Sequence, residues 1–334
     1  MTDTRTEAPS IADRIRAIEA GAPVVGVHFL EDTAVFVLGE EALVFASSDG
    51  ETRRVAVHGG AILTSAADTQ RIVTGGDDGK LMATGAKGTS ETLATDPKRR
   101  WIDHVAVGRD GAFAWSAGKT AFVRTAKGEE RSLEAPSTVG GLAFAPKGFR
   151  LAVAHYNGVS LWFPNAQAQP EKFEWKGSHL GVSFSPDGKF LVSSMQEPTL
   201  HGWRVADRKD MRMSGYSARV RSMDWSADGR WLATSGSEQL ILWPFQTKDG
   251  PMGKQPRIWG VYPERVSVVA SHPRQPVIAV GYADGMVLLV RIDDGAEVLA
   301  RKPGAAPISA LGWNASGSIL AFGIEDGTAG FIVL

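Results

Sequence analysis

The side chains best suited to catalysis or metal binding are scattered along this chain. It contains seven histidines and no close pair among them, at His28, His58, His104, His155, His179, His201 and His272. Asp103-His104 and acidic pairs such as Asp77-Asp78 could offer a cation two ligands, but protein metal sites draw on three or more. We therefore interpret the histidines as structural and the acidic pairs as turn residues, and expect neither a metal nor a cofactor.

Nucleophilic chemistry has no better support. The chain has no cysteine, which excludes disulfides and thiolate metal sites. Its serines lie singly in turn-like segments, and Gly75-Gly76 does not open a helix onto a phosphate. We expect no catalytic residues and a protein that is not an enzyme.

Arginine and aromatic residues, in contrast, gather in a few short segments. Arg, Trp and Tyr are enriched where protein interfaces concentrate their binding energy. The candidate partner-binding residues are Arg99, Arg100, Trp101, His179, Tyr216, Arg219, Trp259, Tyr262 and Arg265. Whether they share a surface depends on the elements that carry them.

Those elements follow a unit of about forty residues that occurs eight times. The last residues of its first strand are Phe29, Ser65, Val107, Phe144, Phe184, Trp225, Ser271 and Trp313, spaced by 36 to 46 residues. Each copy continues through an apolar, Ala-rich second strand and an Asp-Gly or Asn-Gly type of turn such as Asp284-Gly285. Short strands with this period stack radially, so the sequence predicts an all-β propeller of four-stranded blades.

The units resemble WD40 repeats, and the chain is similar to bacterial WD40-repeat propeller proteins. The best matches are Ser185-Pro186-Asp187-Gly188, Ser226-Ala227-Asp228-Gly229 and the strand-end residues Trp162, Trp203 and Trp243. No Asp follows these tryptophans. The resemblance implies a hydrogen-bonded network inside a blade, and we expect it only in part, in the blade that holds His179, Ser193 and Trp203.

The count of copies predicts eight blades, with seven as the alternative. The last copy, residues 308–334, stops after its third strand, and residues 14–24 resemble the outer strand and crossing at residues 297–308. We expect this N-terminal strand to close the ring. An amphipathic helix over residues 11–19, with Ile11, Ile15 and Ile18 on one face, is the alternative.

Composition supports one domain. We expect a disordered tail over residues 1–10 and a single WD40-like propeller domain over residues 11–334. No secretory signal and no apolar run near the ~18 residues of a membrane span are visible, so we expect a cytoplasmic protein with no membrane partner. With 36 basic and 37 acidic residues, the charge balance disfavours nucleic acid as a partner.

The candidate residues fall in the crossings from the outer strand of one blade to the inner strand of the next, which share one face of a propeller. We therefore predict a monomeric, non-catalytic scaffold for protein-protein interaction. Its basic, aromatic face suits a protein or peptide partner, with an acidic or phosphorylated peptide as the natural type. The alternatives are an enzyme or small-ligand binder that uses the central channel, and a nucleic-acid-associated scaffold.

Overall fold

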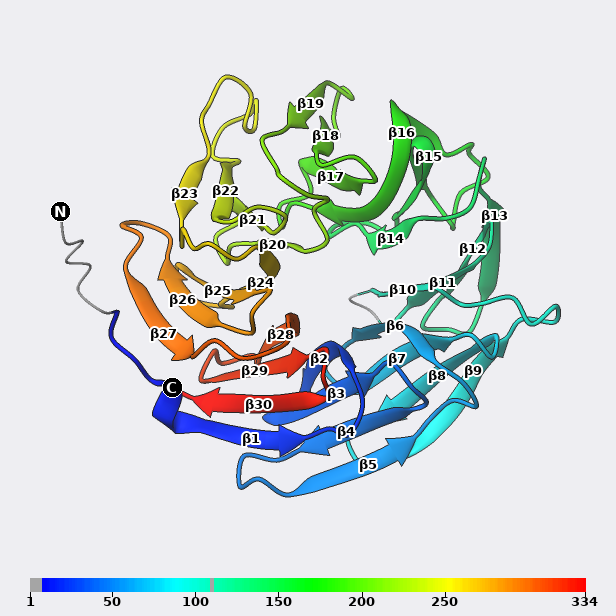
Figure 1. Ribbon diagram of the computed structural model, residues 1–334. Coiled ribbons are helices and arrows are strands. Elements are labelled where there is room, and N and C mark those ends of the chain that lie inside the picture. The colour runs from blue at the N-terminus through cyan, green and yellow to red at the C-terminus, as the bar shows by residue number, and fades with distance from the viewer. Residues whose placement is uncertain (1–7, 109–110) are drawn as a thin grey trace.

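Strands arranged around a central axis account for nearly all the regular structure (Figure 1). The computed structural model describes residues 8–108 and 111–334. Within them, hydrogen bonds join thirty strands into seven sheets, six with four strands and one with six. The prediction of an all-β propeller is confirmed.

Five of the four-stranded sheets use consecutive strands, ordered from the centre of the ring outward. They are β2 (Val24–Leu30), β3 (Thr33–Leu38), β4 (Ala42–Ala46) and β5 (Thr52–Ala56); β6 (Ile62–Ala67), β7 (Arg71–Gly76), β8 (Lys80–Gly85) and β9 (Ser90–Thr95); β10 (His104–Val107), β11 (Phe113–Ala117), β12 (Thr120–Arg124) and β13 (Glu130–Glu134); β20 (Met223–Trp225), β21 (Trp231–Thr234), β22 (Leu240–Pro244) and β23 (Arg257–Trp259); and β24 (Val266–Ser271), β25 (Val277–Tyr282), β26 (Val287–Arg291) and β27 (Glu297–Arg301). All neighbouring strands are antiparallel, for example Ala279 opposite Leu289.

The six-stranded sheet contains two copies of the sequence unit. Its strands are β14 (Gly141–Phe144), β15 (Leu151–Trp162), β16 (Glu171–Phe184), β17 (Phe190–Met195), β18 (Leu200–Arg204) and β19 (Asp210–Met213). The first half of β16 pairs with β15, and its second half, from His179 onward, pairs with β17. Counted as hydrogen-bonded sheets, the described residues form seven blades, which was the alternative count. The eight copies of the sequence unit give seven sheets because β16 runs without a break from the outer strand of the fourth copy into the inner strand of the fifth.

The ring closes between the two ends of the chain. In the remaining sheet, β1 (Ile15–Glu19) lies outside β30 (Thr328–Val333), which is followed inward by β29 (Ile319–Ile324) and β28 (Ile308–Trp313). Ile18 faces Ala329 across this antiparallel pair, and its side chain is 4% exposed. The predicted N-terminal strand is confirmed. Of the alternative helix, only the single 3₁₀ turn η1 (Ala12–Arg14) is present.

The segment before β1 also contacts the neighbouring blade. Ser10 forms a parallel bridge with Leu299 of β27, whose amide donates to the carbonyl of Pro9. Of the tail expected over residues 1–10, residues 1–7 lie outside the described residues, and Pro9 and Ser10 are paired as a short extension of blade β24–β27.

The second strands of the units are buried on both faces, as their apolar composition predicted. Every residue of β21 and of β29 is buried, because each sheet is covered by a neighbour on either side. Small residues fit the narrow gaps near the axis: a Cβ on Gly323 would lie 2.2 Å from Cγ1 of Val24. Gly79, Gly285 and Gly327 have φ values of 75°, 86° and 91°, the left-handed backbone that the Asp-Gly turns require.

Among the helices of the described residues, none is both long enough and apolar enough to cross a membrane.

Candidate functional site

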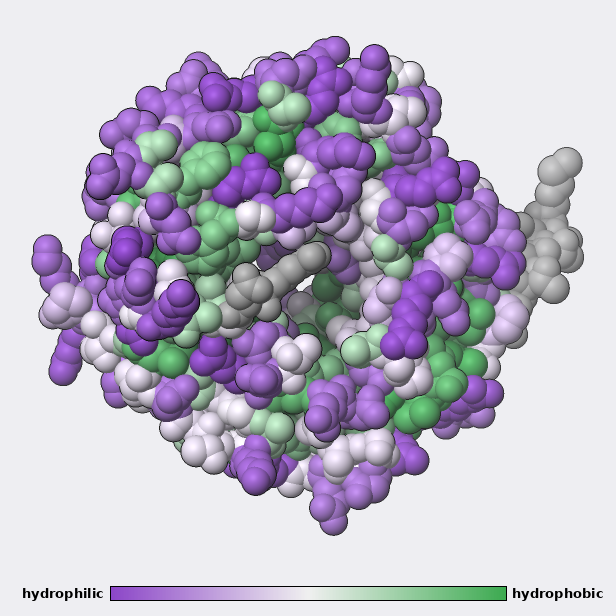
Figure 2. All heavy atoms as spheres, turned by 180° about the vertical axis from the view of Figure 1, so that it is seen from behind, coloured by the Kyte–Doolittle hydropathy of each residue, from purple (hydrophilic) through white to green (hydrophobic). Residues whose placement is uncertain are grey.

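Two kinds of connection emerge together on one side of the ring. They are the crossings between consecutive units, such as residues 96–103, and the turns between the second and third strands, such as residues 283–286. We call this side the crossing face. Figure 2 shows the ring from behind the view of Figure 1, with a hollow at its centre.

Exposed apolar side chains concentrate on the crossing face. Of the ten large apolar side chains that are exposed among the described residues, seven lie in its connections or within two residues of them, namely Val25, Leu63, Trp101, Tyr156, Trp175, Ile258 and Val261. Trp101 is the most exposed of the ten, at 62%. Tyr156 and Trp175 line one hollow of this face together, and contiguous exposed apolar side chains often mark an interaction site.

The crossing from β9 to β10 places its three candidate residues differently. Arg99 and Trp101 point to solvent. Arg100 instead donates from Nε and Nη2 to Oδ2 of Asp96, at 3.1 and 2.7 Å, and the Asp96 side chain is only 2% exposed. These hydrogen bonds hold the pKa of Asp96 below its ordinary value. Arg100 therefore stabilises the crossing, and Arg99 and Trp101 are available to a partner.

Two of the candidate residues do not lie on the surface, which corrects their assignment. His179 is 1% exposed, with Nδ1 2.7 Å from the hydroxyl of Ser193 and Nε2 2.9 Å from the carbonyl oxygen of Trp175. Tyr216 is 8% exposed, and its hydroxyl accepts from Nε1 of Trp243 at 2.6 Å. Both side chains are fully engaged within their blades, so they support the crossing face without forming part of its surface.

The remaining four candidates lie next to the blade β20–β23. Arg219 precedes β20, Trp259 is the last residue of β23, and Tyr262 and Arg265 follow in the crossing to β24. Trp259 is half-buried and donates from Nε1 to the carbonyl of Ile292 at 3.1 Å, so it fills the edge between two blades. Tyr262 donates to Oδ2 of Asp284 at 2.8 Å. Arg219 is half-buried, and Arg265 is exposed.

Arg219 and Arg265 line one cleft of the crossing face. Its volume is about 450 Å³, and it lies between the inner ends of the last three units. Arg221, which was not among the predicted residues, lines the same cleft, together with four serines and Glu325. The structure thus brings two of the nine predicted residues together and adds a third arginine.

The hydrogen-bonded network expected from the resemblance is present in two places that the sequence did not indicate. His58 lies 2.9 Å from the hydroxyl of Thr74 and 3.0 Å from Oδ1 of Asp78. Tyr216 takes the place of the histidine in another blade, because its hydroxyl is 3.0 Å from that of Thr234. His58 lies four positions before Ile62, the first residue of β6, and Tyr216 lies four positions before Val220, which precedes β20. This common spacing is a signal that the sequence contains.

In the blade where the network was expected, it is incomplete. His179 and Ser193 are paired, but Nε1 of the buried Trp203 has no hydrogen-bond partner among the described residues. His201 is stacked on Trp175, with ring centroids 3.9 Å apart, and burial lowers its pKa to about 3. This blade therefore depends more on aromatic packing than on hydrogen bonds.

His28 and Asp224, on the inner strands, are buried with no charged side chain that shifts their pKa values. Burial lowers the pKa of His28 to about 4 and raises that of Asp224 to about 6. Asp224 accepts from the amides of Trp225 and Ser271, at 2.9 and 2.7 Å, and so links β20 to β24. Within residues 8–108 and 111–334, no group of three or more histidine or acidic side chains is placed to hold a metal ion.

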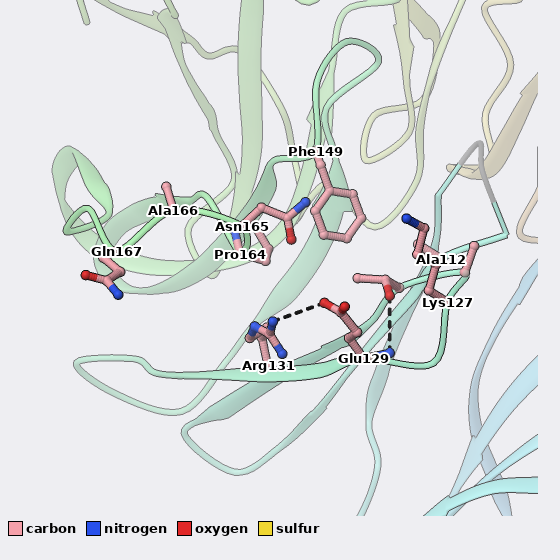
Figure 3. Close-up of a pocket in the computed structure, with 11 residues that line it drawn as sticks. Ala112, Lys127, Glu129, Arg131, Phe149, Pro164, Asn165, Ala166 and Gln167 are labelled. Carbon is pink, nitrogen blue, oxygen red and sulfur yellow. Dashed lines mark hydrogen bonds and ion pairs between the residues drawn. The ribbon is translucent and has the colours of Figure 1, made fainter.

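A larger hollow, of about 730 Å³, lies on the other side of the ring between the third and fourth units (Figure 3). The ring of Phe149 faces Asn165 on one side and Lys127 on the other. Arg131 and Glu129 are paired at 3.0 Å below it. These charges neutralise each other, and none of the predicted residues is part of this hollow.

Comparisons with known proteins agree with this fold. The model of the family described as "WD domain, G-beta repeat" matches residues 209–243, which contain Tyr216, Thr234 and Trp243. The chain is 31% identical over 122 residues to WD repeat-containing protein 1-B of Xenopus laevis, and 29% identical over 112 residues to the 77 kDa echinoderm microtubule-associated protein of Strongylocentrotus purpuratus. These matches cover 34% and 31% of this chain but only 20% and 16% of the relatives.

The fold as a whole also has a counterpart among solved structures. The computationally designed Ika8 protein superposes with a TM-score of 0.77 at 15% identity, covering 96% of this chain and 98% of its own. At that identity the likeness concerns the fold alone. Residues 209–243 thus match a WD40 repeat, and the repeat match, the WD-repeat relatives and the ring of sheets together support a WD40-repeat β-propeller.

Proposed function

We propose that the protein is a non-catalytic scaffold whose crossing face binds a protein or peptide partner. WD40 propellers generally serve as scaffolds for protein interaction, as the relationship to WD-repeat proteins implies. The observation that carries the proposal is the presence of seven of the ten exposed large apolar side chains on this one face.

The surface is chemically suited to a peptide. Trp101 and Tyr156, 62% and 53% exposed, present aromatic area at little cost in side-chain entropy. Arg99, Arg219 and Arg265 add positive charge to the same face. An acidic or phosphorylated segment is the partner type that fits both features.

Affinity capture with the tagged chain tests the proposal. The double variant Trp101→Ala, Tyr156→Ala removes two exposed aromatic rings from the crossing face, and we expect it to recover at least tenfold less of a captured partner. Anchors of this kind carry about 2 kcal/mol or more each at interfaces. Neither side chain makes a hydrogen bond within the described residues, so folding should be retained.

The matched control is Met252→Ala, Val333→Ala, which removes two exposed apolar side chains that lie off the crossing face, 44% and 41% exposed. It should capture the partner as the unmodified chain does. Loss of capture in the control, with full capture by the Trp101, Tyr156 variant, would assign binding to another surface.

A further inference from the structure

The cleft of about 450 Å³ on the crossing face has an unusual balance of charge. Three guanidinium groups line it, those of Arg219, Arg221 and Arg265, against the single carboxylate of Glu325. Its lining therefore carries a formal charge of +2, although the whole chain carries −1.

Two of these guanidinium groups are uncommitted. The side chains of Arg221 and Arg265 make no hydrogen bond and no ion pair within residues 8–108 and 111–334, whereas Arg219 donates from Nη1 to Oε1 of Gln196 at 3.0 Å. The carboxylate of Glu238 accepts from the hydroxyl of Ser217 at 2.9 Å. Arg221 and Arg265 thus keep planar sets of donors that can receive the oxygens of an anion.

The serines of the cleft hold its walls in place through hydrogen bonds to the backbone. The hydroxyl of Ser267 donates to the carbonyl of Ile308, and that of Ser222 accepts from the amide of Val269, so both join neighbouring blades. Ser235 accepts from the amide of Ser222. The hydroxyl of Ser309 is buried and has no partner among the described residues. That hydroxyl is closed to solvent and does not reach the cleft, so the serines act by fixing the strands beside Arg221 and Arg265.

We propose that this cleft binds the phosphoryl group of a phosphorylated serine or threonine side chain on the protein partner. The inference rests on the proposed function and assigns one subsite to it. A phosphorylated side chain carries about −1.5 to −2 charges and three acceptor oxygens, which match the +2 lining and the arginine donors. A carboxylate carries only one charge and would leave part of the +2 charge of the lining unbalanced.

An NMR titration of the full-length chain, following the arginine Nε–Hε resonances at about pH 7 and low ionic strength, tests the subsite. The probes are N-acetyl-O-phosphoserine N-methylamide, the corresponding glutamate derivative and inorganic phosphate. We expect saturable binding of the phosphoserine derivative at least fivefold tighter than that of the other two. The variant Arg221→Gln, Arg265→Gln should weaken it at least tenfold.

The matched control is Lys147→Gln, Arg274→Gln, which removes the same charge from exposed turns on the other side of the ring and should bind as the unmodified chain does. Equal affinity for the phosphoserine and glutamate derivatives would overturn the assignment to phosphate. Tighter binding of inorganic phosphate would point to a free anion in place of a phosphorylated partner. Unchanged affinity in the arginine variant would overturn the site.

Affinity capture separates the failure of this inference from that of the proposed function. If Arg221→Gln, Arg265→Gln captures a partner normally while Trp101→Ala, Tyr156→Ala does not, the crossing face binds the partner and the cleft does not contribute. If both variants capture normally, the proposed function fails as well.

Discussion

Replacing Tyr216 by phenylalanine should destabilise the protein through a single hydrogen bond. The Tyr216 hydroxyl accepts from Nε1 of Trp243 at 2.6 Å, and the two side chains are 8% and 7% exposed. In Tyr216→Phe the indole N–H stays buried without an acceptor. Thr234 keeps its bond to the carbonyl of Ile241 at 3.0 Å. One unsatisfied buried donor costs about 1–3 kcal/mol, so the free energy of unfolding should fall by that amount.

A double-mutant cycle isolates this bond from the change in packing. Trp243→Phe removes the donor together with part of a buried ring, and the double variant removes donor and acceptor at once. Because the double variant leaves no unsatisfied N–H, its loss of stability should be at least ~1 kcal/mol smaller than the sum of the single losses. The control, Tyr156→Phe, changes a tyrosine that is 53% exposed and should alter stability by less than about 0.5 kcal/mol.

Urea denaturation followed by circular dichroism and by tryptophan fluorescence measures these differences, provided that the two transitions coincide. A Tyr216→Phe variant as stable as the unmodified chain would refute the structural role of the hydroxyl. Additive losses in the cycle would refute the coupling between Tyr216 and Trp243. Loss of partner capture without loss of stability would restore Tyr216 as a contact residue.

Two further predictions concern ring closure and pH. Ile18→Ala should lower the free energy of unfolding by about 2–4 kcal/mol because the side chain of Ile18, in β1, is only 4% exposed, whereas Arg14→Ala, on the surface, should change it little; thermal denaturation compares the two. Since Asp224 has a pKa of about 6 in the folded state, above its unfolded value, the folded state binds more protons between about pH 4 and pH 6. This carboxyl should therefore lower stability by at most about 3 kcal/mol as pH rises through that window, while His28 and His201, whose pKa values burial lowers, act in the opposite direction in both proteins. The stability of the unmodified chain relative to Asp224→Asn should thus fall between pH 4 and pH 6 and level off above it when unfolding is measured from pH 4 to pH 8.

The parts of the fold that repeat in the sequence were predictable. Each copy of the unit contains one inner strand, and the ends of these strands, such as Phe144 and Trp313, recur at the spacing of the repeat. The closing strand around Ile18 was recognisable because it resembles residues 297–308. Burial on both faces follows from the apolar second strands. A repeated sequence unit predicts which strands pair, because each copy must form the same backbone hydrogen bonds.

The continuity of β16 was not predictable, because the residues between His179 and the preceding strand look like any other crossing. The side-chain directions at the candidate site were hidden for a similar reason. Tyr216 and Trp101 belong to the same kind of segment, yet one points into a blade and the other to solvent. Direction depends on the three-dimensional path of each crossing, and the sequence period does not specify it. The cleft with Arg221 was not predictable because its lining comes from short segments of three consecutive units, and the period does not show that their side chains face one another.

The pairing of β1 with β30 has a consequence for the order of events during synthesis. Ile18 emerges from the ribosome 311 residues before Ala329, its partner in the sheet. At about 5–20 residues per second, the first strand waits on the order of 15 to 60 seconds for its partner. During that interval Ile15 and Ile18 are exposed apolar residues next to a strand edge that nothing covers. The closing strand therefore makes the nascent chain a candidate for chaperone binding. The last step of folding, in which β1 pairs with β30, resembles the association of two separate chains.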